Sequence, residues 1–300
     1  MITLEKQVEF RIAGGLGNQL FMLCAGIHLS ERSNIRVKFD ISELTAISKL
    51  HPGENVVSLG LLENFETISG SEIKSRKNYF HRMLDKSGLQ RFIPYKSKTL
   101  KVEEIGYFDL SALPLGILRI EGYFQTWKLY SLIKNKPKIT SSCLSSVSDW
   151  YSQQVKTIEH KNFAAIHVRR GDYLLSKNRI NGVLSRKYYE NALKLIPDNL
   201  ELLIFTDSPQ IVRKQFKNIS SNFRILEPPI DSDPVESLLL MSQASHLIIS
   251  NSTFSWWAAA YSHSSAKIYA PTKWFELRNN PVDLYPNSWI TVQSEWEIQK

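Results

Sequence analysis

The sequence predicts an α/β protein whose sheets are mostly parallel. Three observations support this class: short apolar segments alternate with helical stretches, polar loops follow the apolar segments, and no fixed-period repeat is found. The chain has 300 residues, 43% hydrophobic and 22% charged, which suits a globular protein of two average domains. We expect the domains to comprise residues 1–145 and 146–300, because Ser, Lys and Pro accumulate in Lys134–Asp149.

The first half begins as a strand, a glycine-rich loop and a helix. Val8–Ile12 alternates apolar and polar residues, and "AGGLGN" interrupts that alternation. Apolar residues then recur at helical spacing from Leu16 onward. Further strands are expected at Ile35–Asp40 and Ile117–Gln125, whereas the region 41–115 is predicted to be irregular, with several short helices.

The second half alternates five strands with four helices. The expected strands are Phe163–Val168, Leu202–Thr206, Phe223–Leu226, His246–Ser250 and Lys267–Ala270. The expected helices are Arg186–Ile196, Pro209–Lys217, Pro234–Ala244 and Phe254–His263. Such alternation favours a parallel sheet with helices on both faces, and ligands of these sheets collect where strands end and helices begin.

The glycine-rich loop "GGLGNQL" (Gly14–Leu20) is the first of four candidate ligand loops. Glycine lets backbone N–H groups approach a ligand closely, and the helix N-terminus behind the loop favours an anion. The loop matches neither the dinucleotide nor the phosphate-loop pattern. A tight turn before a packed helix is therefore an equal alternative.

The second loop follows the strand in "AIHVRRGDY" and carries His167, Arg169, Arg170 and Asp172. The arginine fork of donors matches phosphate oxygens and stays charged at any working pH. By alternation, Arg169 shares a face with His167 while Arg170 points to the other face. We expect Arg169 to hold a diphosphate and Arg170 to orient Asp172; a structural ion pair with Asp172 is the alternative.

The third loop is "FTDSP", in which Asp207 follows a predicted strand. Its carboxylate is a candidate acceptor for guanine N–H groups or ribose hydroxyls. The alternative is a helix start, since Ser208 suits an N-cap and Pro209 the first helical position.

The fourth loop is "SNSTFSWWAAAY" (Ser250–Tyr261), which closes a strand and opens an apolar helix. The hydroxyl and amide groups of Asn251, Ser252 and Thr253, with the free N–H groups of the first helical turn, predict an anion site. The Trp256–Trp257 pair is expected to pack in the core rather than stack on a base.

No metal or other cofactor is expected. "DSD" (Asp231–Asp233) resembles a metal-binding DxD motif, but Asp233, Pro234 and Glu236 also form an N-cap, a first-turn proline and a capping box, which we favour. The seven histidines show no ligand spacing, and no CxxC motif is present.

Charge and cysteine content indicate where the protein works. Lys74–Lys101 holds nine Lys or Arg and one acidic residue within a chain of net charge +8, which suits either an anionic membrane surface or a solvated helical face. Two cysteines, the absence of a 20-residue apolar run and an N-terminus without a signal-peptide core favour the cytoplasm. Peripheral contact with the inner membrane through this basic segment is a hypothesis.

"GGLGNQLF", "HVRRGDY", "FTD" and "NSTFSWW" together resemble the motif set of glycosyltransferase family 11, the bacterial and animal α-1,2-fucosyltransferases. The resemblance implies a GT-B-like architecture of two facing, Rossmann-like α/β domains, acceptor-side first and donor-binding second. It also implies metal-independent, inverting transfer of fucose from GDP-β-L-fucose to the 2-hydroxyl of a terminal galactose.

Carried over to matching positions, Arg169 would hold the β-phosphate, His167 the nucleoside, and Asn18 with Ser252–Phe254 the rest of the diphosphate pocket. The full candidate donor-binding set is Gly15, Gly17, Asn18, His167, Arg169, Arg170, Asp207, Asn251, Ser252, Thr253 and Phe254.

The sequence leaves three candidate functions and three candidate general bases. The leading function is a fucosyltransferase that decorates an O-antigen or other surface glycan, with a lipid-linked acceptor. The alternatives are an enzyme of this fold with another nucleotide sugar, and a non-catalytic glycan- or nucleic-acid-binding protein. Inverting displacement needs a general base, for which Asp40, Glu121 and Asp172 are the candidates.

Overall fold

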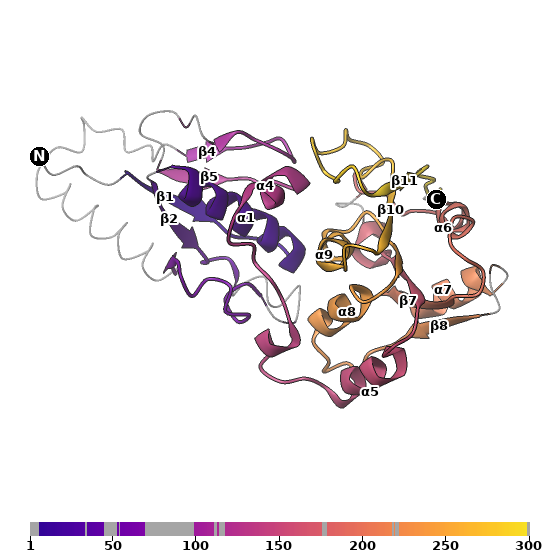
Figure 1. The fold of residues 1–300 in the computed structure, drawn as a ribbon. Coiled ribbons are helices and arrows are strands. Elements are labelled where there is room, and N and C mark those ends of the chain that lie inside the picture. The colour runs from indigo at the N-terminus through magenta and orange to yellow at the C-terminus, as the bar shows by residue number, and fades with distance from the viewer. Residues whose placement is uncertain are drawn as a thin grey trace, which may run out of the picture. The chain divides into compact units, whose positions relative to one another are not determined.

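The computed structural model describes residues 6–33, 35–44, 53, 55–69, 99–110, 113, 118–175, 179–217, 219 and 222–298. The chain forms two compact units, Met1–Pro137 with Val282–Leu284, and Lys138–Pro281 with Tyr285–Lys300. Each unit contains one sheet (Figure 1). The division falls inside Lys134–Asp149; the assignment of 1–145 to the acceptor and 146–300 to the donor stays a prediction.

The first unit contains a five-stranded sheet of order β3-β2-β1-β5-β4, in which all described pairs are parallel. Its strands are β1 (Lys6–Arg11), β2 (Ile35–Asp40), β3 (Glu66–Ile68), β4 (Thr99–Lys101) and β5 (Arg119–Glu121). Strands β3 and β4 lie in the region predicted to be irregular. Strand β5 is shorter than the predicted strand because the chain turns at Phe124, whose φ is 50°.

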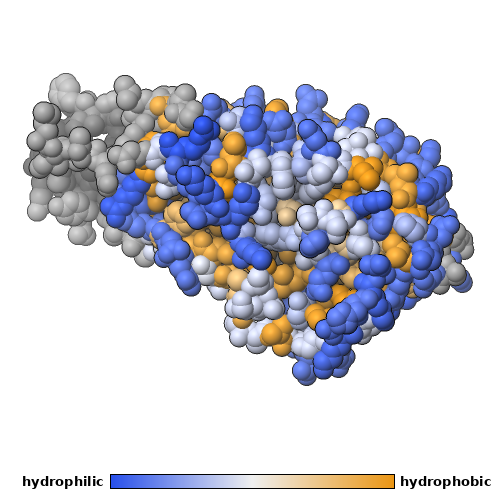
Figure 2. Space-filling model, in the orientation of Figure 1, coloured by the Kyte–Doolittle hydropathy of each residue, from blue (hydrophilic) through white to orange (hydrophobic). Residues whose placement is uncertain are grey.

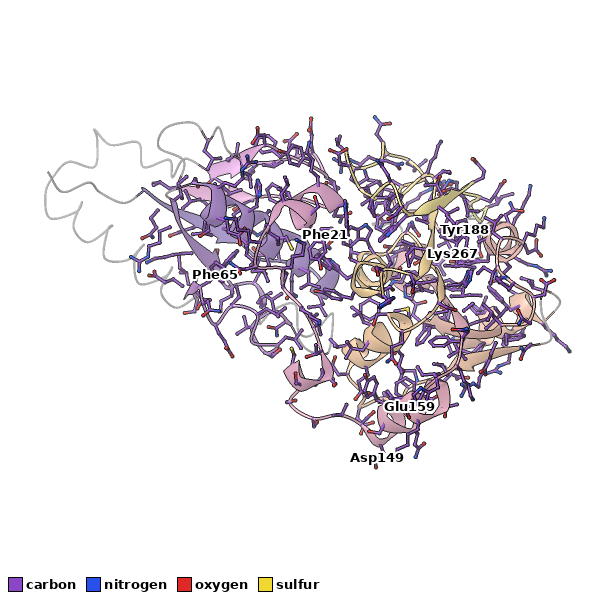
Figure 3. The ribbon with its side chains drawn as sticks, viewed as in Figure 1. Phe21, Phe65, Asp149, Glu159, Tyr188 and Lys267 are labelled. Carbon is purple, nitrogen blue, oxygen red and sulfur yellow. The ribbon has the colours of Figure 1, made fainter. Side chains whose placement is uncertain are left out.

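Helices α1 (Leu16–Arg32) and α4 (Trp127–Leu132) belong to the first unit. Helix α1, which carries Phe21 (Figure 3), packs against the sheet face that presents Phe10 and Phe39. A Cβ on Gly26 would lie 2.4 Å from the Phe39 ring, so glycine allows this close approach. The alternate strand positions carry the charged residues discussed below.

The second unit contains a six-stranded sheet of order β11-β10-β9-β6-β7-β8, again parallel in every described pair. Its strands are β6 (Phe163–Val168), β7 (Glu201–Thr206), β8 (Phe223–Leu226), β9 (His246–Ile248), β10 (Lys267–Pro271) and β11 (Ile290–Val292). Every residue of the central strand β6 is buried, as expected when helices cover both faces. The predicted parallel α/β class is therefore confirmed.

The main helices of this unit are α5 (Asp149–Ile158), α6 (Arg186–Leu193), α7 (Pro209–Phe216), α8 (Pro234–Met241) and α9 (Thr253–Tyr261). Tyr188 of α6 and Phe216 of α7 pack with Ala164 and Ile166 of β6 in one core. Helices α8 and α9 contact each other and lie on the opposite side of the sheet (Figure 1).

Helix α5, with Asp149 at its start and Glu159 just beyond its end (Figure 3), falls partly within the predicted junction and was not anticipated. Ser148 caps α5 by accepting a hydrogen bond from Tyr151 N at 3.0 Å. Asp233 caps α8 as predicted, accepting from Val235 N at 2.7 Å. The predicted capping-box role of Glu236 is wrong: its buried carboxylate accepts hydrogen bonds from Ser148 N and Oγ.

Figure 2 shows hydrophilic side chains spread among smaller apolar groups on the visible face of the described residues. No helix in the described part of the chain is long and apolar enough to cross a membrane. Most of the basic segment Lys74–Lys101 lies outside the described residues, which resume at Thr99.

Candidate active site

Three of the four predicted ligand loops come together at one edge of the second sheet. Strands β9, β6 and β7 are neighbours, and their parallel pairing places the ends of all three at the same edge. The loops that follow them contain Arg169–Asp172, Asp207 and Ser250–Phe254. This edge is the place where parallel α/β sheets bind ligands.

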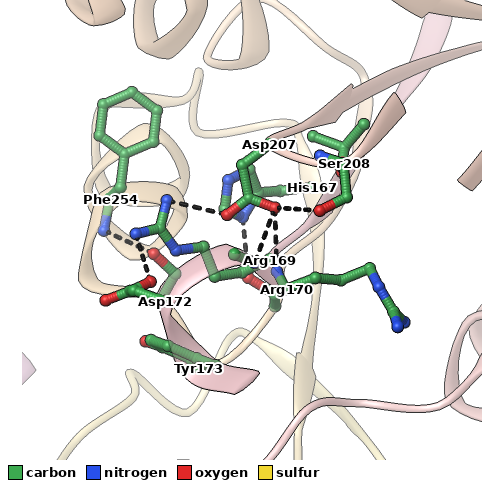
Figure 4. Close-up of polar contacts among 12 residues, drawn as sticks. His167, Arg169, Arg170, Asp172, Tyr173, Asp207, Ser208 and Phe254 are labelled. Atoms are coloured by element: carbon green, nitrogen blue, oxygen red, sulfur yellow. Dashed lines mark hydrogen bonds and ion pairs between the residues drawn. The ribbon is translucent and has the colours of Figure 1, made fainter. Parts of the chain in front are cut away.

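The Arg169 guanidinium lies between two carboxylates at this edge (Figure 4). Its Nη2 is 2.6 Å from Asp172 Oδ1, and its Nη1 is 3.1 Å from Asp207 Oδ2. The Tyr173 ring centroid lies 5.8 Å from the guanidinium carbon. Both carboxylates contact Arg169 at the strand-end edge, and its diphosphate contact stays a prediction.

The predicted role of Arg170 in orienting Asp172 is wrong. The Arg170 side chain, 8% exposed, pairs instead with Glu297 near the C-terminus, which also accepts a hydrogen bond from Gln215 Nε2 at 3.0 Å. Asp172 instead accepts a hydrogen bond from Arg169. Because alternation sends Arg170 to the other face, its charge ties the C-terminal segment to the end of β6.

Asp207 accepts several hydrogen bonds from the protein itself. Its Oδ1 accepts from Arg170 N at 3.0 Å, Gly171 N at 3.2 Å and Ser208 Oγ at 3.2 Å, and its Oδ2 pairs with Arg169. Helix α7 begins as predicted, with Ser208 at the N-cap position and proline in the first turn. The carboxylate thus links the loops after β6 and β7.

His167 is buried below Arg169 as a neutral group. Burial, with a further contribution from the Arg169 charge, lowers the pKa of His167 to about 4. Its Nδ1 lies 2.8 Å from Ser250 Oγ, and its ring centroid lies 6.0 Å from that of Phe254. A neutral imidazole can donate or accept one hydrogen bond toward a nucleoside without adding charge.

The first turn of α9 begins within the predicted loop Ser250–Tyr261. Ser252 is the N-cap, and its Oγ accepts from Phe254 N at 3.3 Å. Thr253 and Phe254 of the first turn are only partly buried, so they border the same edge. The unpaired N–H groups of such a turn attract anions.

Asn251 and the tryptophan pair have packing roles in this structure. The Asn251 amide nitrogen donates to the carbonyls of Asn181, Gly182 and Trp274, at 2.8, 3.3 and 3.2 Å, and so holds two loops together. Trp256 and Trp257 are fully buried with ring centroids 5.0 Å apart, which confirms the core assignment.

The remaining predicted loop, Gly14–Leu20, belongs to the first unit. Gly14 has φ of +77°, a conformation that favours glycine, and Gly15 is the N-cap of α1, with Gly17 buried in its first turn. Asn18 Oδ1 accepts from Gln125 Nε2 at 2.9 Å, which ties the loop to the segment after β5. Gly14, Gly15, Gly17 and Asn18 therefore lie at the strand-to-helix turn.

Two of the three candidate bases lie in an ion-pair network of the first unit. Arg119 Nη1 is 2.6 Å from Asp40 Oδ2, and Arg119 Nε is 2.8 Å from Glu121 Oε1. Burial raises the pKa of Asp40, but hydrogen bonds from Ser42 and the Arg119 guanidinium outweigh it, so that pKa lies below its usual value. Asp40 is 1% exposed and Glu121 21% exposed.

No three His, Cys, Asp or Glu side chains among the described residues lie close enough to form a metal site. The two cysteines are unpaired, and Cys24 is buried. Sequence reasoning missed Gly171, Tyr173 and Glu297, which shape the edge of the second sheet, and Gln125, which contacts Asn18 in the first unit. Glu297 carried no local signal, whereas Gly171 follows the arginines directly in "RRGDY".

Comparison with known proteins identifies the family. The sequence pattern of glycosyl transferase family 11 matches residues 103–293. The chain is 26% identical to an Escherichia coli alpha-1,2-colitosyltransferase over 293 residues, covering 95% of this chain and 99% of the relative. It is 30% identical over 161 residues to the Escherichia coli O-antigen biosynthesis glycosyltransferase WbnK, covering 52% and 53%.

A rabbit (Oryctolagus cuniculus) galactoside alpha-(1,2)-fucosyltransferase 1 is 29% identical over 104 residues, 33% of this chain and 28% of the relative. Among solved structures, fucosyltransferase NodZ from Bradyrhizobium superposes with a TM-score of 0.51 at 12% identity, covering 87% of this chain and 94% of NodZ. This confirms the GT-B class expected from the motifs. The chain belongs to glycosyl transferase family 11 and is a glycosyltransferase related to fucosyl- and colitosyltransferases.

Proposed function

We propose that the protein transfers L-fucose from GDP-β-L-fucose to the 2-hydroxyl of a terminal galactose, with inversion and without a metal ion. The acceptor is a unit of an O-antigen or another surface glycan, carried on a lipid at the cytoplasmic side of the inner membrane. The observation that carries the proposal is the placement of Arg169 beside the start of α9, at the shared edge of β6, β7 and β9.

The relatives support this donor and acceptor class. One relative is named an alpha-1,2-colitosyltransferase and another a galactoside alpha-(1,2)-fucosyltransferase. A third is named for O-antigen biosynthesis. A NodZ α-1,6-fucosyltransferase, which shares the fold with a TM-score of 0.51, was crystallised with GDP. A guanosine diphosphate at the equivalent edge would meet the Arg169 fork, the first turn of α9 and the neutral His167.

The proposed chemistry is a single in-line displacement. The bond from the anomeric carbon to the diphosphate oxygen breaks as the galactose hydroxyl attacks from the opposite side, and GDP leaves with added negative charge. In the absence of a metal ion, Arg169 and the α9 first-turn N–H groups would stabilise that charge. The Arg169 guanidinium and these N–H groups are held in place before GDP-fucose binds. Hydrogen-bond donors that are positioned in advance stabilise the developing charge effectively.

The same geometry separates the three candidate bases. Asp172 contacts the arginine that would hold the leaving phosphate, so it belongs to the leaving-group side of the sugar, whereas the base must act on the opposite side. Asp40 is buried against Arg119. Of these two candidates in the first unit, Glu121 is the more exposed at 21%, and we propose it as the base. Glu121→Gln should lower kcat while GDP affinity stays unchanged.

The test is acceptor-dependent GDP release from GDP-fucose with EDTA present, using lactose, Galβ1,3GlcNAc and Galβ1,3GalNAc. Release that requires both an acceptor and Arg169 supports the proposal. Arg186→Ala, which removes a partly exposed arginine of α6, is the matched control and should release GDP at the wild-type rate. Activity that disappears with EDTA, or survives in Arg169→Ala, contradicts it.

The similarity to a colitosyltransferase over almost the whole length of both chains favours a second donor. The same assay with GDP-colitose, GDP-mannose and UDP-galactose in place of GDP-fucose separates the candidates. A higher kcat/KM with GDP-colitose would show that colitose, rather than fucose, is the transferred sugar. The proposed acceptor and the proposed role of Arg169 would not change.

A further inference from the structure

We propose that Glu297 is a positioning residue of the donor site, which holds Arg169 in place through Arg170 and does not contact the donor. The inference deepens the proposed function and rests on it, because it assumes that Arg169 receives the β-phosphate. It starts from one observation: Arg170 directly follows the predicted phosphate ligand, but its side chain points to the other face and pairs with Glu297.

The segment Glu295–Glu297 is fixed by backbone hydrogen bonds to the residues before α6. Ser185 N donates to Glu295 O at 2.7 Å, and Glu297 N donates to Val183 O at 2.8 Å. These bonds involve main-chain atoms alone, so they remain when the Glu297 side chain is changed. A substitution at Glu297 therefore tests the carboxylate rather than the course of the chain.

The Arg170 guanidinium depends on the Glu297 carboxylate as its counter-ion. The Arg170 side chain is 8% exposed, and its Nε is buried without a hydrogen-bond partner among the described residues. Glu297 is itself restrained, because it also accepts a hydrogen bond from Gln215 Nε2 at 3.0 Å. Without the carboxylate, a nearly buried charge would lose its partner, and we expect the Arg170 side chain to turn toward solvent.

The backbone of Arg170 links this ion pair to Asp207. Arg170 N and Gly171 N donate to Asp207 Oδ1 at 3.0 and 3.2 Å. A Cβ on Gly171 would lie 2.7 Å from Asp207 Oδ2, so the backbone here lies directly against the carboxylate. Turning the Arg170 side chain away would shift these N–H groups and loosen Asp207.

Asp207 in turn fixes one end of the Arg169 guanidinium. Its Oδ2 is 3.1 Å from Arg169 Nη1, while Asp172 contacts Nη2. Loosening Asp207 would disturb Arg169 without freeing it, because the Asp172 contact remains. Charge alone predicts the opposite sign, since removing the negative Glu297 would favour an anionic diphosphate. The direction of the effect therefore distinguishes positioning from electrostatic attraction.

GDP and GMP affinities are measured by isothermal titration calorimetry for the wild type, Glu297→Ala and Glu297→Gln. We expect Glu297→Ala to bind GDP about five- to twenty-fold more weakly, as for residues that act on a ligand site without contacting the ligand. Glu297→Gln keeps the side-chain volume and an oxygen acceptor, so it should lose about two- to five-fold. GMP lacks the β-phosphate, so its affinity should stay within about two-fold in both variants, which a general weakening of the fold would not produce.

Glu295→Ala is the matched control, because Glu295 lies on the same segment and pairs with Lys187 of α6 at 3.6 Å, with its side chain 37% exposed. It should bind GDP as the wild type does. Gln215→Ala removes the second contact of Glu297 and keeps the Arg170 pair, so it should change GDP affinity by less than about two-fold. Far-ultraviolet circular dichroism and melting temperature establish whether each variant is folded, and Glu297→Gln decides the test if Glu297→Ala is not.

GDP binding by the Glu297 variants that equals or exceeds that of the wild type would overturn the positioning role. Equal losses for GDP and GMP would overturn it too, because they indicate a general disturbance of the site. A loss in Gln215→Ala as large as in Glu297→Ala would overturn the route through Arg170 and place it in α7. If the wild type does not bind GDP, or binds it equally after Arg169→Ala, the proposed function itself fails, which is a different result.

Discussion

Each unit of the molecule contains an arginine placed among carboxylates near the ends of its parallel strands, yet the two clusters differ in how they are built. Arg119 lies within strand β5 and contacts Asp40 of β2, Glu121 of its own strand and, at 3.7 Å, Glu9 of β1. Arg169 lies just beyond the end of β6, and its partners Asp172 and Asp207 are in loops.

This difference teaches that charge type alone does not identify a ligand site. Arg119 is 20% exposed and its partner Asp40 only 1%, so the pairing register of three strands fixes the network. Arg169 is 29% exposed, and one of its partners is a partly exposed side chain on a turn. The Arg119–Asp40 pair of the first cluster is expected to stabilise its sheet, and Arg169 of the second cluster to bind an anion.

The strongest way to break the comparison is to remove the second arginine. Arg169→Ala should lower kcat/KM for fucose transfer by about 10²- to 10³-fold, or about 3–4 kcal/mol, because it removes a fixed donor to the leaving group. Urea unfolding should change little. A variant whose turnover falls less than ten-fold would show that other groups carry the leaving-group charge.

The reciprocal test is made in the first unit. Asp40→Asn leaves the Arg119 charge with one fewer partner in a buried network, which should lower the free energy of unfolding by about 3 kcal/mol. The measurement is urea denaturation followed by circular dichroism. Glu66→Gln, at a carboxylate 36% exposed, is the control and should cost under about 1 kcal/mol. Equal effects of both variants would remove the distinction between buried and exposed pairs.

The neutral histidine beside Arg169 sharpens the comparison through pH. The pKa of His167 is about 4 in the folded chain, below the value of about 6.5 expected when unfolded. The unfolded chain therefore binds the proton first, so stability is full above pH 6.5 and falls as the pH drops toward 4. Between pH 7 and pH 4.5 the contribution lost is about 2 kcal/mol.

Urea midpoints at the two pH values measure this loss, and His167→Gln should remove that part of the acid sensitivity. His263→Gln, at an exposed histidine, should retain it. If His167→Gln shows the same pH dependence as the wild type, the histidine is not held neutral by its site.

The smallest effect is expected at the outer rim of the first cluster. Arg11 and Glu43 form a two-point ion pair, at 2.9 and 2.6 Å, but their side chains are 34% and 43% exposed. Glu43→Gln should change the free energy of unfolding by less than about 1 kcal/mol, because solvent screens the pair. A larger loss in the same urea experiment would make this pair part of the buried network.

The elements with strong local signals were predicted closely. Strands β6 and β8 have the predicted bounds, and the loops after β6, β7 and β9 share one edge, as parallel pairing requires. Strands β3, β4 and β11 were missed because three residues are too few for an alternation pattern. These three strands form because they pair with a neighbouring strand, and a single sequence does not reveal that pairing.

The side-chain partners were harder to predict than the loops. Alternation correctly separated Arg169 from Arg170, but Arg170 contacts Glu297, 127 positions away, and Glu236 contacts Ser148, 88 positions away. Local patterns such as a capping box carry no information about contacts at that separation. The sequence likewise offers no way to see that Asp207 faces Gly171 and Arg169, since this contact depends on the register of β6 and β7.

The central claim is that the strand-end loops of the second unit bind a guanosine diphosphate through Arg169. Calorimetric titration of GDP into the wild type, Arg169→Ala and the control Arg186→Ala tests it most directly. We expect wild-type binding that Arg186→Ala retains and Arg169→Ala loses by at least about ten-fold. Equal GDP affinity in all three proteins would contradict the assignment of this edge as the donor site.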